Sequence, residues 1–243
     1  MSVLLSDAQL RHFTEHGYVV VPDLLPVEDV EAFLARDREF GEARPAGLQN
    51  HQTHESYTAI ARHASVVGKI RQLVGGAPRV VQTMYMAKPP EGGTGVALHQ
   101  DTHYIRNEPN TLTACWMAFS QTGPDNGGLV VAPGSHKEGL LSAGRVRESD
   151  QHADWEQDYE MRGPDGEQWS QTMTSHDIYA YGPDNVEHLE VAPGGGVFFS
   201  SLTVHGSYAN KTADHPRLAF ATHYVREDSW VYRADLQDLV PAD

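Results

Sequence analysis

Residues 96–104 read VALHQDTHY, a run in which a carboxylate stands between two imidazoles. Its Val, Thr and Tyr content predicts a β-strand over Val96–Tyr104. Successive side chains of a strand point to opposite faces, so we expect His99, Asp101 and His103 to share one face. An imidazole and a carboxylate on one face can bind a metal ion together. The alternative is a surface strand whose polar side chains face water.

Similar short runs surround this stretch from Arg79 onward, rich in Val, Tyr, Thr and aromatic residues and separated by Gly, Pro, Asn and Asp clusters. This spacing is typical of strands and turns, and the clearest turns are Asp125–Gly128 and Pro193–Gly196. We predict strands at Val80–Ala87, Val96–Tyr104, Leu112–Ser120, Gly128–Val131, Ile178–Tyr181, Val197–Ser200, Ser201–His205 and Leu218–Val225.

Helical patterns precede the strands. Ser6 starts an amphipathic stretch that stops at Gly17, which predicts a capped helix. Further segments are a strand at Tyr18–Val21 and helices at Pro26–Phe40 and Ile60–Leu73. Helices followed by strands favour a mainly β fold, with a jelly-roll core over residues 79–230 and a helical flank over 1–78. The 243 residues suit a single domain, since jelly rolls and barrels run to about 200–250 residues.

The composition indicates which kinds of molecule the protein is expected to bind. A formal charge of −15 argues against nucleic acid, because binding to phosphate backbones needs clusters of Lys and Arg. It also disfavours a polyanionic substrate and favours a small polar molecule. No apolar run approaches the roughly 18–20 residues of a membrane span, and residues 1–10 lack a secretory signal pattern. Together with the single Cys115, this predicts a soluble, cytoplasmic protein.

His205 completes a possible set of metal ligands. It follows the apolar strand Val197–Ser200, and with His99 and Asp101 it supplies two imidazoles and one carboxylate. This set, bound on one face of the metal with open positions opposite, suits non-haem Fe(II) oxygenases. Zinc fits less well, because its catalytic sites keep fewer vacant positions. The alternative is that His205 is a hydrogen-bonded core histidine.

Arg217 follows His205 by twelve positions, after a turn-like segment over 208–216. The strand that carries Arg217 can therefore return beside the one that carries His205. A guanidinium makes a planar two-point contact with a carboxylate, as anchoring of a dicarboxylic co-substrate requires. The alternative is a surface arginine that pairs with Asp214.

Several of these segments, in order, resemble the phytanoyl-CoA dioxygenase family of Fe(II)/2-oxoglutarate oxygenases. The resemblance covers nearly the whole chain. It rests on Leu10–Leu25 with HGYVVVPDLL, Leu98–Tyr104 with its H-x-D motif, the Trp-containing Leu112–Phe119, Asn126–Lys137 reading NGGLVVAPGSHK, and Val204–Arg217 with HGS and the closing arginine.

The resemblance implies a double-stranded β-helix of the cupin-like type, with Fe(II) bound by His99, Asp101 and His205. It further implies 2-oxoglutarate and O2 as co-substrates, with contacts to the oxoacid from Arg217 and from Ser207, Trp116 and Gln82. Trp116 can equally be a core residue. We place His103, Tyr104 and Tyr57 as substrate contacts.

The expected reaction is hydroxylation of an unactivated C–H bond in a small polar metabolite or biosynthetic intermediate, with release of succinate and CO2. Asp101 fills the position that related halogenases leave to a halide, which favours hydroxylation. Desaturation, cyclisation or demethylation by the same cofactors is the first alternative. A non-catalytic, cupin-like metal- or ligand-binding protein is an alternative of another class.

The acidic segment Gly139–Glu190 is too long for an ordinary connection. It includes a run of carboxylates and three aromatic residues: Asp150, Asp154, Glu156, Asp158, Glu160, Trp155, Tyr159 and Trp169. Long excursions of this kind often cover binding sites, so we expect a lid over the iron pocket. The alternative is a solvated surface excursion anchored by its aromatic residues.

Overall fold

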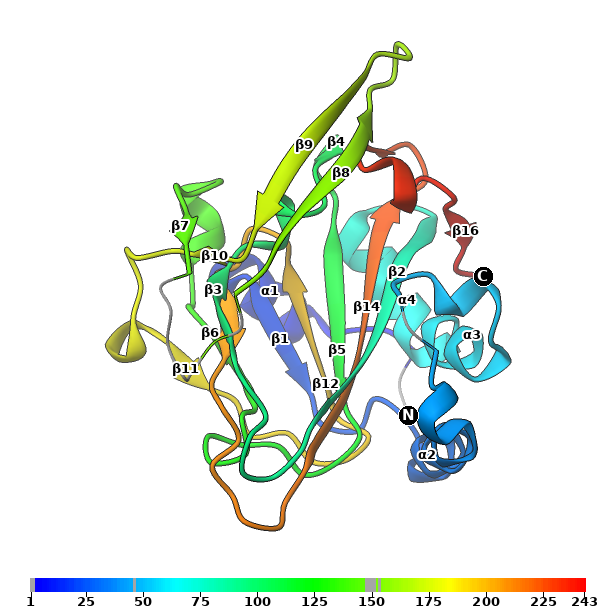
Figure 1. Ribbon diagram of the computed structural model, residues 1–243. Coiled ribbons are helices and arrows are strands. Elements are labelled where there is room, and N and C mark those ends of the chain that lie inside the picture. Colours follow the sequence, from blue (N-terminus) through cyan, green and yellow to red (C-terminus); the bar gives the residue numbers. More distant parts are fainter. Residues whose placement is uncertain (1–2, 46, 147–151, 153) are drawn as a thin grey trace.

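Two antiparallel sheets form the body of the protein in a computed structural model, which describes residues 3–45, 47–146, 152 and 154–243 (Figure 1). The larger sheet has the order β1 (Tyr18–Val21), β12 (Gly196–Ser200), β5 (Thr113–Ala118), β14 (Arg217–Arg226), β2 (Pro78–Lys88) and β16 (Val240–Pro241). The smaller sheet has the order β11 (Glu187–His188), β6 (Leu129–Val131), β13 (His205–Ser207) and β3 (Val96–His99). This mainly β, cupin-like arrangement confirms the predicted fold class.

Three strand pairs lie outside these sheets: β4 (Asn107–Glu108) with β15 (Trp230–Val231), β7 (Gly144–Arg145) with β10 (His176–Asp177), and β8 (Glu156–Arg162) with β9 (Gln168–Thr174). Short 3-10 helices connect the strands and helices: η1 (Gly41–Ala43), η2 (Asn50–Gln52), η3 (Asp101–His103), η4 (Ser135–Glu138), η5 (Pro183–Asn185) and η6 (Ala234–Leu236). Among the described residues, no helix is both long and apolar enough to span a membrane.

The α-helices are α1 (Asp7–His16), α2 (Val27–Phe40), α3 (Glu55–Ala61) and α4 (Ala64–Val74). The first begins and ends as predicted, with a capping box at Ser6 and a left-handed Gly17 at φ 83°. The stretch predicted as one helix over Ile60–Leu73 is instead two helices. His63 separates them, because its backbone is extended and its side chain accepts a hydrogen bond from the Ser65 amide.

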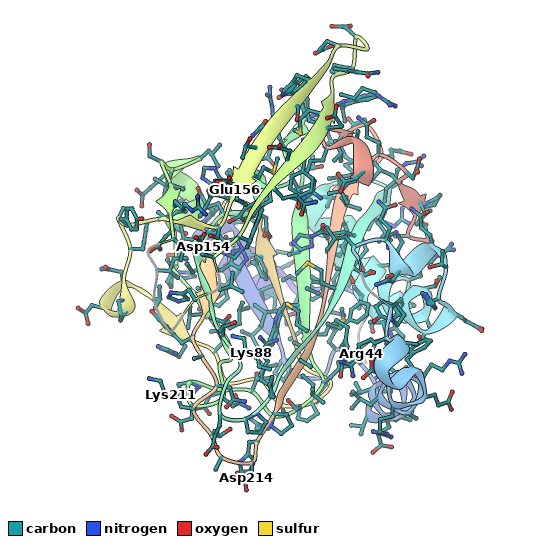
Figure 2. All side chains as sticks on the ribbon, viewed as in Figure 1. Arg44, Lys88, Asp154, Glu156, Lys211 and Asp214 are labelled. Atoms are coloured by element: carbon teal, nitrogen blue, oxygen red, sulfur yellow. The ribbon has the colours of Figure 1, made fainter. Side chains whose placement is uncertain are left out.

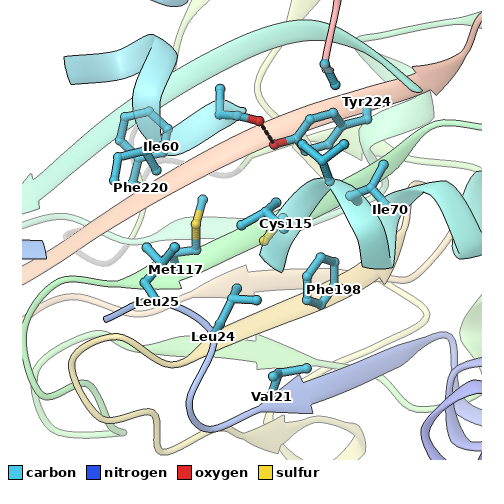
Figure 3. Close-up of a cluster of buried hydrophobic side chains, with 14 of the residues drawn as sticks. Val21, Leu24, Leu25, Ile60, Ile70, Cys115, Met117, Phe198, Phe220 and Tyr224 are labelled. Atoms are coloured by element: carbon cyan, nitrogen blue, oxygen red, sulfur yellow. Dashed lines mark hydrogen bonds between the residues drawn. The ribbon is translucent and has the colours of Figure 1, made fainter. Parts of the chain in front are cut away.

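The alternation of side chains along β5 and β14 separates two cores. Cys115 and Met117 of β5 point outward with Phe220 of β14, and α2, α3 and α4 cover this face (Figures 1 and 3). The intervening Trp116 and Ala221 point inward, toward the smaller sheet. This period of two explains why the helical flank and the candidate site occupy opposite faces of one sheet.

Three strands predicted from the sequence differ in the structure. Strand β3 ends at His99, and residues 101–103 form η3, whose first turn is closed by the Tyr104 amide donating to the Asp101 carbonyl. Residues 201–203 are a turn, so β13 begins only at His205. The segment Ile178–Tyr181 forms turns rather than a strand. Each segment lies where the chain crosses between sheets, and turn hydrogen bonds there replace strand pairing.

The long acidic segment contains a regular hairpin, β8–β9, which was not among the strands predicted from the sequence. Figure 1 shows it projecting beyond the sheets. Its outer part packs on the C-terminal region, where the Arg162 amide donates to the Tyr232 carbonyl and Trp230 Nε1 donates to the Arg162 carbonyl. Asp150, one of the carboxylates in this segment, lies outside the described residues.

Candidate active site

His99, Asp101 and His205 come together at one end of the space between the two sheets. His99 is the last residue of β3, His205 is the first of β13, and the two are direct partners across these strands. Asp101 starts η3, so a turn rather than strand alternation brings its carboxylate beside the imidazoles. One ligand atom of each of these buried residues lies within 4.8 Å of the others. The spacing suits three ligands on one face of a metal ion.

The two imidazoles are oriented for metal binding by their other ring nitrogens. Nδ1 of His99 lies 2.8 Å from the Ala97 carbonyl, and Nδ1 of His205 lies 2.9 Å from the Thr203 carbonyl. A carbonyl oxygen only accepts, so both Nδ1 atoms carry the proton and Nε2 is left to bind metal. Burial, followed by repulsion from His99, lowers the pKa of His205 to about 4 and keeps it neutral.

The Asp101 carboxylate is shared between this cluster and a fourth side chain. Its Oδ1 lies 3.6 Å from Nε2 of both His99 and His205, whereas its Oδ2 lies 3.0 Å from Nε2 of His223. Burial by itself would raise the pKa of Asp101, but the adjacent His223, which also hydrogen-bonds to the carboxylate, lowers that pKa well below its usual value. The group is therefore an anion in a buried cluster, as a metal ligand must be. The donor set and its protonation fit a divalent iron.

A cavity of about 100 Å³ extends from these ligands between the sheets. The larger sheet lines it with Met84, Met86, Trp116, Phe199, Arg217, Ala221 and His223, and the smaller sheet with Val96, His99, Leu129, His205, Gly206 and Ser207. The walls are mainly apolar. Polar groups are concentrated at the histidine cluster and around Arg217, so the cavity suits a small molecule with charged groups to be bound at both places.

Arg217 is buried, with 3% of its surface exposed. Its Nη1 donates to the Met86 carbonyl at 3.3 Å, and its Nε has no hydrogen-bond partner among the residues that the structure describes. The alternative of a surface pair with Asp214 is wrong, because Asp214 is exposed and pairs with His215. A buried guanidinium with an unpaired N–H is a ready site for a carboxylate.

The family model for phytanoyl-CoA dioxygenase (PhyH) matches residues 13–219. The chain belongs to the phytanoyl-CoA dioxygenase family. The peroxisomal phytanoyl-CoA dioxygenase of Rattus norvegicus is 28% identical, over 93% of this chain and 70% of that protein. The ectoine dioxygenase of Halomonas elongata is also 28% identical, over 93% and 72%. The chain is thus an enzyme, a 2-oxoglutarate-dependent dioxygenase.

Solved structures share the fold of this dioxygenase. The non-heme alpha ketoglutarate dependent carbocyclase SnoK from nogalamycin biosynthesis has a TM-score of 0.71 and 25% identity, covering 98% of this chain and 92% of that chain. The epimerase SnoN, crystallised with Fe3+, alpha ketoglutarate and nogalamycin RO, has a TM-score of 0.70 and 18% identity, covering 93% and 85%. Proteins that catalyse different reactions thus share this architecture.

The three residues predicted to contact the oxoacid beside Arg217 lie in two different places. Ser207 and Trp116 line the cavity, and Ser207 follows His205 on the same strand, as predicted. Gln82 lies behind the cluster, where its Nε2 is 3.2 Å from Nδ1 of His223. In this position Gln82 orients His223, which in turn orients Asp101.

The three expected substrate contacts lie in different places. Tyr104 lies 5.6 Å from His99, measured between ring centroids, and stacks on His176 at 5.0 Å. His103 is turned away from the expected His99 face, because η3 directs its Nε2 to the Leu141 carbonyl at 2.9 Å. Tyr57 is 1% exposed and packs in the core under the helices.

Two further polar residues of the dioxygenase belong to this region, His223 and Lys88: His223 was not singled out from the sequence, and Lys88 was considered only as an alternative cation to Arg217. In β14, His223 stands six residues after Arg217 and so faces the same side of the sheet. In β2, Lys88 stands six residues after Gln82 on the inward face. Counting every second residue from Arg217 along β14 leads to His223, and the same count from Gln82 along β2 leads to Lys88.

Proposed function

We propose that the protein binds one Fe(II) through His99, Asp101 and His205 and uses 2-oxoglutarate and O2 to hydroxylate an unactivated C–H bond of a small polar metabolite or biosynthetic intermediate. Succinate and CO2 are the co-products. The helical flank of residues 1–78 and the strand core of 79–230 act as one domain, since the helices pack on the larger sheet and β1 of the flank is one of its strands. The observation that carries the proposal is the position of Arg217 in the same cavity as the three ligands.

The ligand set supports iron over a structural metal. Two neutral imidazoles and one carboxylate leave the opposite positions open for a co-substrate and O2. The backbone carbonyls of Ala97 and Thr203 hold the imidazoles in place, so the site is oriented before metal arrives. A non-catalytic binding protein would not need these three ligands and an unpaired buried arginine in one cavity.

The residues of the chain have separate tasks in this reaction. When bound, Fe(II) and 2-oxoglutarate supply the activation of O2, coupled to decarboxylation of the oxoacid. Arg217 binds the distal carboxylate of the oxoacid through its free N–H groups, and the Ser207 hydroxyl assists. Trp116, Leu129 and the other apolar walls exclude water from the reacting atoms.

The direct test is substrate-dependent formation of succinate. The Fe(II)-loaded protein is incubated with 2-oxoglutarate and candidate substrates, starting from those in the names of its relatives, phytanoyl-CoA, ectoine and methylphosphonate, followed by small polar metabolites. We expect one substrate to raise succinate above the uncoupled background and to gain one oxygen atom by mass spectrometry. The proposal fails if the wild type consumes no more 2-oxoglutarate than the Asp101→Ala variant does.

Oxidative cyclisation is the second candidate outcome. It is supported by the likeness to the carbocyclase SnoK, which spans 98% of this chain. Cyclisation and hydroxylation differ by mass: a cyclised product loses two hydrogens, whereas a hydroxylated product gains oxygen. The same assay therefore separates the two outcomes.

A further inference from the structure

A chain of aromatic rings leads from the proposed metal ligand His99 to the surface. Between ring centroids, Tyr104 lies 5.6 Å from His99, and Trp155 lies 5.6 Å from Tyr104. Tyr104 is partly buried, whereas Trp155 has 38% of its surface exposed. The two side chains therefore join the buried ligand cluster to solvent.

Contacts with the segment before and in β10 hold both rings in place. The Tyr104 hydroxyl accepts a hydrogen bond from the His176 amide at 2.7 Å, and the His176 ring stacks on the phenol at 5.0 Å. The Ser175 amide donates to the Trp155 carbonyl at 3.0 Å, and the Trp155 amide donates to Ser175 Oγ at 3.3 Å. Because Ser175 and His176 are neighbours in the chain, Tyr104 and Trp155 are fixed relative to each other.

Tyr104 and Trp155 carry the two kinds of aromatic ring that lose an electron most readily, a phenol and an indole. The ring of Phe199 also lies beside a proposed ligand, 4.4 Å from that of His205, but a benzene ring is far harder to oxidise. A phenol followed by an indole can pass electrons from the surface toward His99, one ring at a time, without a lasting covalent change.

The cavity wall contains side chains that an unused oxidant would damage. Met84, Met86 and Trp116 line the same cavity as the three proposed ligands. A thioether is readily oxidised to the sulfoxide, which replaces an apolar group by a polar one. When 2-oxoglutarate reacts with O2 and no substrate is bound, the capacity to remove two electrons remains in this cavity. Either the wall or an outside donor must supply those electrons.

A base for the phenol proton lies beside Tyr104. The hydroxyl oxygen accepts from the His176 amide, so its own hydrogen is available for transfer. Nδ1 of the stacked His176 ring is buried and has no hydrogen-bond partner among the described residues. Burial, followed by repulsion from His103, lowers the pKa of His176 to about 4, so the ring is neutral. A phenol that has lost an electron is a strong acid, and a neutral imidazole suffices to take its proton.

We propose that Tyr104 and Trp155 form an electron path through which the enzyme oxidises a one-electron reductant at its surface when no substrate is bound. The inference rests on the proposed function, which supplies the oxidant. Tyr104 passes an electron inward and its proton to His176, Trp155 restores Tyr104, and the reductant restores Trp155. Two such transfers balance the reaction: 2-oxoglutarate, O2, two electrons and two protons from solvent give succinate, CO2 and water.

The reductant reacts at Trp155, so it does not have to enter the cavity of about 100 Å³. The neighbours of this residue, Asp154 and Glu156, both pair with Arg145, and Figure 2 shows them at the end of the hairpin nearest the sheets. The protein as a whole has a formal charge of −15, which attracts cations and repels anions. The class of reductant that fits this surface is therefore a small cationic or uncharged one-electron donor.

A ferrocene that carries a trimethylammonium group is the probe, because it is cationic, gives up one electron and is too bulky for the cavity. The Fe(II)-loaded protein is supplied with 2-oxoglutarate and O2 but no substrate. We expect two ferrocenium ions for each succinate, and less oxidation of Met84 and Met86 by peptide mass spectrometry than without the ferrocene. Succinate formation without ferrocenium, or no succinate until a substrate is added, would overturn the proposal.

Conservative variants separate electron transfer from packing. Tyr104→Phe and Trp155→Phe keep a ring at each position, and each should lower the yield of ferrocenium per succinate toward zero and increase oxidation of Met84 and Met86. Trp169→Phe, in β9 of the same hairpin, has its ring 6.2 Å from that of Tyr232 and should match the wild type. An unchanged ferrocenium yield in both Tyr104→Phe and Trp155→Phe would overturn the path.

Electron paramagnetic resonance of samples frozen during the reaction gives a second readout that does not depend on turnover. Without ferrocene, Trp155→Phe should accumulate a tyrosyl radical that is absent in the double variant with Tyr104→Phe. If the wild type forms no succinate with or without any candidate substrate, the proposed function itself fails. If it forms succinate but shows neither the radical nor ferrocenium, only the inference about Tyr104 and Trp155 fails.

Discussion

His223 places its Nε2 atom 3.0 Å from Oδ2 of Asp101, although 122 residues separate the two in the chain. The other oxygen of this carboxylate, Oδ1, faces Nε2 of His99 and His205 at 3.6 Å each. One oxygen thus faces the proposed metal position, and the other contacts His223. Gln82 extends the arrangement by contacting Nδ1 of His223 at 3.2 Å.

We expect His223→Leu to lower the affinity for Fe(II) by about 10–100-fold, the usual effect of removing a residue that orients a metal ligand. The three ligands stay, so metal binding is weakened rather than lost. The measurement is equilibrium dialysis with Fe(II) without oxygen. His215→Leu, at an exposed position, is the control and should bind as the wild type does. Unchanged affinity in His223→Leu would contradict this role.

Asp101→Ala should remove both tight metal binding and turnover. The variant lacks the only carboxylate of the ligand cluster and leaves His223 without its partner. Metal content and succinate formation are the two measurements. His103→Ala is the matched comparison and should keep the metal, since its ring contacts the Leu141 carbonyl. Near wild-type turnover by Asp101→Ala would show that the ligand assignment is wrong.

Arg217→Met should raise the KM for 2-oxoglutarate steeply and leave Fe(II) binding largely intact. Truncating one partner of a buried charge pair costs about 2–5 kcal/mol, and Arg217 is buried at the far wall of the cavity. Steady-state kinetics at saturating Fe(II) measure the change. Arg226→Met, on the same strand but paired with Asp228, should have a normal KM. An unchanged KM in Arg217→Met would assign the anchoring to another cation.

We expect the base of the β8–β9 hairpin to gain protection from hydrogen exchange when Fe(II), 2-oxoglutarate and a verified substrate bind. Between ring centroids, Trp155 lies 5.6 Å from Tyr104 and Tyr104 lies 5.6 Å from His99, so aromatic contacts run from the hairpin to a proposed metal ligand. The outer part is held by the C-terminal region and should change little. Equal protection at the base with and without ligands would rule out a lid.

Tyr57→Ala should destabilise the protein by about 3–5 kcal/mol, the range for a large aromatic side chain removed from a core. Its ring lies 5.3 Å from Phe33 and 5.4 Å from Phe220 and is 1% exposed. Urea unfolding measures the loss, and Tyr57→Phe is the conservative control. The folded Tyr57→Ala protein should keep the substrate preference of the wild type. A changed substrate preference in this variant would show that Tyr57 contacts the substrate.

The alternation of side chains along the strands and the two ends of the first helix follow from the amino-acid sequence alone. In β14, Arg217 and Ala221 alternate with Phe220, and the period of two in a strand requires them to face opposite sides. Ser6 and Gly17 mark the first helix because their local backbone and side-chain preferences act within a single turn. The class of chemistry was predicted from the order of His99, Asp101, His205 and Arg217 together with the resemblance of several segments to the dioxygenase family.

The atoms that meet in the site could be identified only from the folded structure. The turn at Asp101 replaced a predicted strand, because hydrogen bonds within η3 outweigh strand pairing at the edge of the sheet. The contacts of His223 with Asp101 and of Lys88 with Ser207 join strands far apart in the chain. Such contacts depend on the register between strands and the distance between sheets. Neither is encoded in the side-chain pattern of one strand, since both result from the packing of all the strands around one cavity.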